Sequence, residues 1–150
     1  MAHAARARTA GVIFLDANVF ISHLVAPATP QDVAMAAASA HLFGQIELGQ
    51  VEATTSEATL AEVAFILTDK KHYGGPRAAA ALGIRNLLVP KTFRLDTKRI
   101  VLRALTLWES NPAISFPDSI AAEYSELRGY QLATFDNRLR REPTVTLHQF

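Results

Sequence analysis

Four carboxylates stand where apolar segments of the chain end or are interrupted. Asp16 and Asp136 each follow an apolar segment directly, Glu62 interrupts another, and Asp118 follows a Phe-Pro pair. An acid beside buried apolar residues is costly unless something pairs with it. If folding brings the four together, a cation must offset their repulsion, and oxygen ligands favour Mg²⁺ or Mn²⁺. The pattern indicates a metal site of the kind found in enzymes that act on phosphodiesters.

Each acid also has a structural explanation when it is taken alone. Asp16 can cap a helix, and Asp136 can form a turn or a cap. Asp118 lies in a first helical turn, where the helix dipole favours an acid. Glu62 can belong to a solvent-facing stripe of its helix. No single acid decides between structure and catalysis.

The elements that must position these acids alternate along the chain. Short apolar, partly β-branched segments are expected as strands, and segments with capping and breaking residues as helices. The expected strands are Val12–Leu15, Gln50–Thr55, Thr92–Leu95, Tyr130–Thr134 and Thr144–Leu147. The expected helices are Val19–Leu24, Val33–Phe43, Glu57–Lys71, Arg77–Leu88, Lys98–Glu109 and Asp118–Arg128. This alternation predicts an α/β fold with a mostly parallel sheet of about five strands, covered on both faces. Ligands bind at the carboxyl ends of such strands, where Asp16 and Asp136 lie.

Composition sets further bounds. A chain of 150 residues with 49% apolar residues fits one domain with its own core. The absence of cysteine excludes disulfides and thiolate chemistry, and the five histidines show no paired spacing typical of zinc sites. No apolar segment is long enough for a membrane span or a signal peptide, so we expect a cytoplasmic protein.

A net charge of +1 predicts little about partners, but basic residues cluster locally. The two clusters are Arg94, Lys98, Arg99 and Arg103, and Arg138, Arg140 and Arg141. A basic rim around an acidic pocket suits a polyanionic substrate, and the second cluster closely follows Asp136. Its three arginines are therefore candidate contacts for RNA phosphates. A solvated helix face explains the first cluster equally well.

Four stretches together resemble PIN-domain nucleases, specifically the VapC-type toxins of bacterial toxin–antitoxin pairs. The stretches are Phe14–Ile21, Thr59–Leu67, Phe116–Ala122 and Leu132–Leu139. Each is weak alone, but four in order are specific, and the resemblance covers nearly the whole chain. Ser119 stands where Ala is more usual and Asn137 where a basic or other polar residue is common, and neither departure removes a ligand.

The resemblance implies a three-layer α/β/α sandwich, a single PIN domain over residues 1–150 with a flexible lead-in over 1–10. It implies an endoribonuclease that uses one or two Mg²⁺ or Mn²⁺ ions. The acidic quartet would be Asp16, Glu62, Asp118 and Asp136, with Asn18 and Thr134 in supporting positions. The family usually forms homodimers, and a cognate VapB-like antitoxin blocks the pocket.

Three alternatives stay open. The chain could be a PIN nuclease of RNA maturation or decay rather than a toxin, or an inactive PIN-like module that only binds RNA or protein. A phosphoaspartate protein is the third. Phosphatases of that kind need a second Asp where Asn18 stands, and receiver domains need adjacent acids after the first strand and a late Lys, neither of which this sequence offers clearly.

Overall fold

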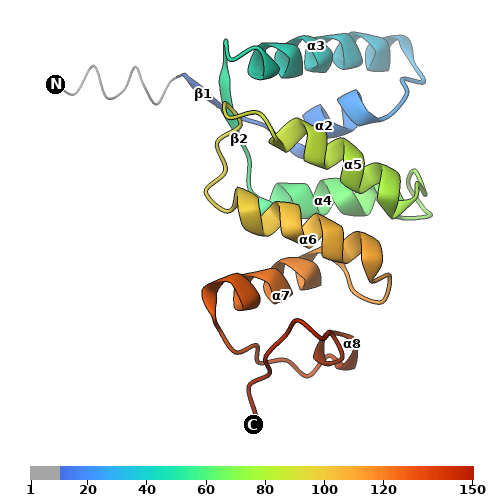
Figure 1. Ribbon diagram of the computed structural model, residues 1–150. Helices are drawn as coiled ribbons and strands as arrows, with labels where there is room; N and C mark the ends of the chain where they lie inside the picture. Colours follow the sequence, from blue (N-terminus) through green and yellow to red (C-terminus); the bar gives the residue numbers. More distant parts are fainter. Residues whose placement is uncertain (1–10) are drawn as a thin grey trace, which may run out of the picture.

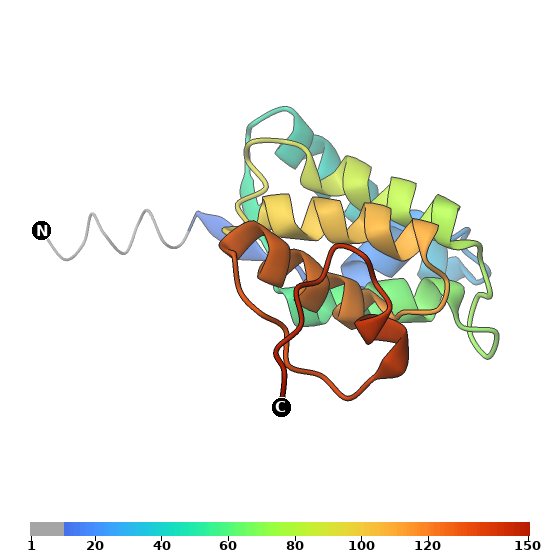
Figure 2. The same cartoon turned by 60° about the horizontal axis from the view of Figure 1, so that its bottom comes forward.

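The computed structural model describes residues 11–150, so the flexible lead-in expected over residues 1–10 lies outside the described residues. Helices dominate this part of the chain (Figure 1). The elements are β1 Val12–Phe14, α2 Ala17–Leu24, α3 Pro30–Glu47, β2 Glu52–Thr54, α4 Glu57–Thr68, α5 Arg77–Leu88, α6 Lys98–Ser110, α7 Phe116–Arg128 and α8 Asn137–Arg140. Figures 1 and 2 both place the two strands at one end of the molecule, with the helices extending beyond them.

The sheet is parallel, as predicted, but it has two strands in the described residues and not five. β1 pairs with β2 in the register Ile13 to Ala53. The segment expected as a third strand makes one bridge, Ala53 to Phe93. It pairs no further because it begins in a turn, in which Phe93 N–H donates to the Pro90 carbonyl. The two segments expected as fourth and fifth strands make a single bridge to each other, Leu132 to Leu147, and neither joins β1.

Local capping chemistry accounts for where the helices begin and end. Thr29 and Asp32 form a reciprocal capping box that opens α3, and the Ser56 hydroxyl accepts from Thr59 N–H to open α4. α7 ends at Gly129, whose φ of 69° is the left-handed conformation that favours glycine. Helix α5 has the predicted bounds, whereas α4 stops at Thr68, before the predicted Lys71.

One main core joins most of the helices, and a small one lies under the C-terminal segment. Phe20, Leu60 and Ile84 are fully buried in the main core. The smaller cluster is Leu107, Ile114, Ala122 and Leu139. No helix between residues 11 and 150 is both long enough and apolar enough to cross a membrane.

A single side chain links α5 to the turn between α6 and α7. Nη1 of Arg77 donates to the carbonyls of Trp108 (2.8 Å), Asn111 (3.1 Å) and Ile114 (2.9 Å). The guanidinium also lies over the Trp108 ring, 5.0 Å from its centroid. Partial burial lowers the pKa of Arg77 from its usual value. Arg77 therefore fixes the entry into α7, the helix that carries Asp118.

Candidate functional site

The two strands bring Asp16 and Glu62 to one pocket. Asp16 follows β1, and Glu62 lies in the second turn of the helix that follows β2. The strand ends are joined, because Leu15 N–H donates to the Thr54 carbonyl and Thr55 Oγ1 donates to the Leu15 carbonyl. Both acids therefore lie beyond the carboxyl edge of the sheet, where ligands bind in α/β folds.

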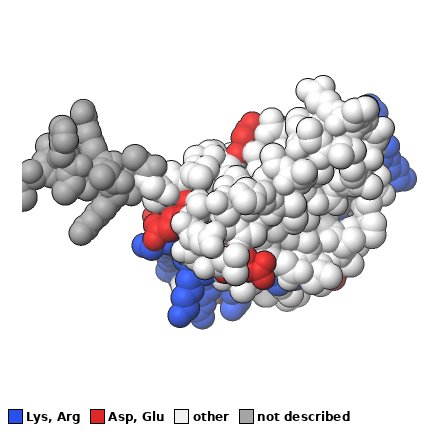
Figure 3. All heavy atoms as spheres, turned by 90° about the horizontal axis from the view of Figure 1, so that it is seen from above, with Lys and Arg blue, Asp and Glu red and all other residues white. Residues whose placement is uncertain are grey.

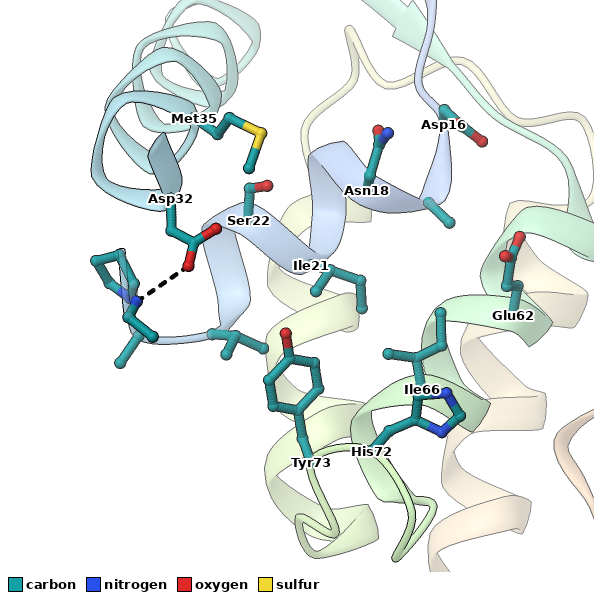
Figure 4. A pocket seen from close by; sticks show the side chains of 15 residues that line it. Asp16, Asn18, Ile21, Ser22, Asp32, Met35, Glu62, Ile66, His72 and Tyr73 are labelled. Atoms are coloured by element: carbon teal, nitrogen blue, oxygen red, sulfur yellow. Dashed lines mark hydrogen bonds between the residues drawn. The ribbon is translucent and has the colours of Figure 1, made fainter. Parts of the chain in front are cut away.

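The pocket has a volume of about 600 Å³ and lies mainly between α2 and α4. Asp16, Asn18 and Glu62 occupy one end of it, as Figure 4 shows. Ile21 and Ile66 line the middle. Both acids are exposed to solvent. The acidic end is thus an open site rather than a buried ion pair.

Asp16 occupies the N-cap position of α2 without forming the cap. Its backbone is extended, as a cap requires, yet its carboxylate accepts no hydrogen bond from the helix. The sequence allowed a purely structural role for this residue, and that role is not observed. Its carboxylate oxygens are consequently available to a ligand.

Asp118 and Asp136 do not line this pocket. Asp118 Oδ2 accepts from Ser115 N–H at 3.0 Å, and together these residues form the capping box of α7. Asp136 Oδ1 accepts from Arg138 N–H at 2.8 Å and caps α8. Residues 11–150 contain no group of three or more His, Asp or Glu side chains close enough to hold one ion. The structure therefore brings together two of the four predicted acids.

The predicted supporting residues divide in the same way. Asn18 lines the pocket beside Asp16. Thr134 belongs to the C-terminal segment, where its hydroxyl accepts from Asp136 N–H at 3.0 Å. Arg140 donates to the Thr134 carbonyl, and Arg138 and Arg141 are exposed on the same segment. As candidate phosphate contacts, these arginines lie with Asp136 and not with Asp16.

Three of the four residues of the other basic cluster lie together at a separate hollow, and Arg94, which pairs with Glu52 at 3.4 Å, does not line it. Arg85, Lys98, Arg99 and Arg103 line a hollow of about 650 Å³ between α5 and α6. A 2.7 Å hydrogen bond to buried Glu123 raises the pKa of Arg103. The pKa of Lys98 is lowered, mainly by partial burial and further by the positive charge of Arg94. None of these residues lines the acidic pocket, so they do not form its rim.

No sequence motif indicated the other end of the pocket. Ser22, Asp32, Met35 and Tyr73 lie there, on α2, on α3 and in the loop after α4, and His72 lies beside Ile66. Asp32 caps α3, and its Oδ2 accepts from the N–H groups of Ala28 and Thr29. The one local signal for Tyr73 was its place just before the Gly-Gly-Pro break.

The donors at the acidic end fit a hard divalent cation. They are two carboxylates and one amide, all oxygen-bearing, and Mg²⁺ in proteins is commonly held by one or two carboxylates with water and substrate phosphates completing its shell. The donor types at this end therefore suit a divalent cation whose shell is completed by water and a substrate oxygen.

Comparison with known protein families gives a match over most of the chain. A family model described as PIN domain matches residues 13–143. No curated protein matches the chain.

Proposed function

Because the chain belongs to the PIN domain family, we propose that it is a metal-dependent endoribonuclease centred on Asp16 and Glu62. PIN domains are generally nucleases, which supports hydrolysis of a phosphodiester. The observation that carries the proposal is the free carboxylate of Asp16, which holds the cap position of α2 without using it and shares a pocket with Glu62.

Asp16, Glu62 and Asn18 would hold Mg²⁺ or Mn²⁺. When bound, the ion lowers the pKa of water and offsets charge on the attacked phosphate. The two carboxylates would hold the ion and, through it, the phosphate, and the Asn18 amide can donate to a phosphate oxygen. In-line attack by water leaves a 5′-phosphate and a 3′-hydroxyl, so the RNA 2′-hydroxyl is not needed as nucleophile.

Asp118 and Asp136 complete the quartet that the sequence predicts. Their part in catalysis stays a prediction, because each carboxylate caps a helix and lies outside the pocket. Arg138, Arg140 and Arg141 likewise stay candidate phosphate contacts for RNA that reaches the C-terminal segment.

The toxin role belongs to the same proposal. We propose a cytoplasmic homodimer restrained by a VapB-like antitoxin. Support for a protein partner comes from the face on which α3 lies, where few charged side chains interrupt the centre (Figure 3). Val33 and Met35 of that helix are exposed. A PIN nuclease of RNA maturation or decay is the alternative, and it predicts that induction without a partner leaves growth unchanged.

The test compares the wild type with Asp16→Asn and Glu62→Gln, which keep side-chain shape and remove one charge each. We expect Mn²⁺-dependent cleavage of single-stranded RNA to fall roughly a thousandfold in each, since several kcal/mol of charge stabilisation is lost. Glu109→Gln, at an exposed position of α6 away from the pocket, is the matched control and should cleave normally. Unchanged cleavage by Asp16→Asn, or wild-type protein that cleaves no RNA with either metal, contradicts the proposal.

A further inference from the structure

The end of the pocket opposite the acids has no part in holding a metal. It is lined by Ser22, Val25, Pro27, Met35 and Tyr73, with the capped carboxylate of Asp32 at its edge. Apolar side chains and a ring predominate, so this end differs chemically from the acidic end. We refer to these residues as the outer half of the pocket.

Tyr73 is held at the outer half by its loop while its ring stays accessible. Tyr73 N–H lies 3.4 Å from the Ile66 carbonyl, and Gly74 and Gly75 N–H donate back to the carbonyls of Asp69 and Leu67 at 2.9 and 2.8 Å. Gly74 has a φ of 59°, which favours glycine at this turn. The backbone is therefore fixed, yet Tyr73 is 55% exposed. Its ring also borders a second, apolar cavity of about 230 Å³, so core packing does not cover it.

The charges of the side chains that line the outer half indicate which kind of chemical group can bind there. No Lys or Arg lines any part of the pocket, and His72 lies beside Ile66 with its Nδ1 3.0 Å from Asp69 Oδ2, so the outer half lacks an ammonium or guanidinium group to hold a phosphate. Both backbone donors near Asp32 are satisfied by its own Oδ2, which leaves a negative edge that repels anions. A neutral, planar group that stacks on an aromatic ring fits this surface best, and a nucleobase is such a group.

The outer half is continuous with the acidic end. Asn18 and Val25 are seven residues apart on and just after α2, which corresponds to about 10 Å of helix. A span of this size, in a pocket of about 600 Å³, accommodates one nucleotide whose phosphate lies at the acids. We infer that the outer half binds the base of the nucleotide adjacent to the scissile phosphate, with Tyr73 as its stacking platform. This inference rests on the proposed nuclease function.

The experiment scans one short single-stranded RNA with an abasic ribose placed at each position in turn. Binding is measured by fluorescence anisotropy in EDTA, and cleavage is measured in Mn²⁺. For the wild type, we expect one abasic position next to the cleaved bond to weaken binding about tenfold, as the loss of one stacked base does. In Tyr73→Ala that position should match the intact RNA, because the stacking partner is already absent. Tyr73→Phe should restore the wild-type profile.

Tyr130→Ala is the matched control, since Tyr130 is 57% exposed and does not line the pocket. It should keep the wild-type profile. A scan in which Tyr73→Ala and the wild type show the same sensitivity at every position overturns the inference, as does binding that is insensitive to all abasic positions. Wild-type protein that shows the expected binding profile but no cleavage contradicts the nuclease function instead. Unchanged melting temperatures confirm that the variants are folded.

Discussion

The four predicted acids lie in two regions of the molecule, and their carboxylates make different contacts in the two. In the region from β1 to α4, Asp16 and Glu62 share a pocket, and the carboxylate of Asp16 makes no cap. In the region from α7 to the C-terminus, Asp118 and Asp136 each accept a backbone N–H at a helix start. Three of the four acids stand at helix N-termini, so position alone does not distinguish them. What differs is whether the local backbone uses the carboxylate.

Because of this difference, substitutions of these acids can separate effects on activity from effects on stability. A carboxylate that serves as a cap contributes to stability whatever else it does, whereas an unused one can change with little effect on folding. Activity and stability should therefore be affected together in the C-terminal region and separately at the pocket.

The largest effect on stability is expected where α5 is linked to the turn that leads into α7. Arg77→Ala removes four hydrogen bonds and a cation–π contact, and we expect a loss of about 3 kcal/mol in the free energy of unfolding. Urea denaturation measures the loss, and hydrogen exchange should show the greatest gain in rate around the α6–α7 turn. Arg85→Ala, which loses one exposed bond to Thr106, is the control and should cost little. Equal effects of the two variants would mean that the contacts of Arg77 do not hold α5 to the α6–α7 turn.

Metal binding tests whether two acids or four form the site. At a hundred times its dissociation constant, Mn²⁺ should stabilise the wild type by about 2.7 kcal/mol, seen as a rise in melting temperature. EDTA should reverse the rise. Asp16→Asn and Glu62→Gln should lose most of it.

Asp118→Asn and Asp136→Asn show whether the metal site is formed by two acids or by four, because Asn can still cap a helix while the charge is removed. We expect both to keep most of the Mn²⁺ effect, as their places outside the pocket indicate. If either loses it as fully as Asp16→Asn, the four acids form one site and the contrast between the regions does not hold for metal binding.

Alanine substitutions give the smallest effect and the most direct comparison. Asp118→Ala breaks the capping box of α7 and should cost about 1 kcal/mol, whereas Asp16→Ala should cost nearly nothing because no cap bond is lost. Asp136→Ala should cost less than Asp118→Ala, since α8 is a single turn. Thermal denaturation without metal measures all three. A loss for Asp16→Ala equal to that for Asp118→Ala would show that Asp16 is structural after all.

How much the sequence predicts depends on whether the decisive interactions are local. Ser56 opens α4 and Gly129 ends α7 through contacts within a few residues, so these bounds could be predicted. Strand pairing is not local: the segment Tyr130–Thr134 has the composition of a strand, yet only Leu132 forms a bridge. The strand count was therefore wrong while the parallel pairing was confirmed.

The candidate site follows the same rule. The sequence predicted Asp16 and Asp136 at strand ends and all four acids in one site, but β1 pairs with β2, so Glu62 shares the pocket with Asp16 while Asp136 lies outside it. Tyr73 was not predictable, since its place depends on hydrogen bonds that fold the loop from Asp69 to Gly75 back against α4. The cap at Asp136 is local and was foreseen as an alternative for that acid, whereas Asp118 was expected only as an acid favoured by the helix dipole and not as part of a capping box.

The contacts of Arg77 constrain how this chain can vary over evolution. Its hydrogen bonds are made to main-chain carbonyls, so the side chains of the turn that follows Trp108 can be exchanged without altering them. An insertion or deletion in the turn would shift those carbonyls out of reach of the guanidinium. Related sequences with an arginine at this position should therefore differ in the residue types of the turn while keeping its length.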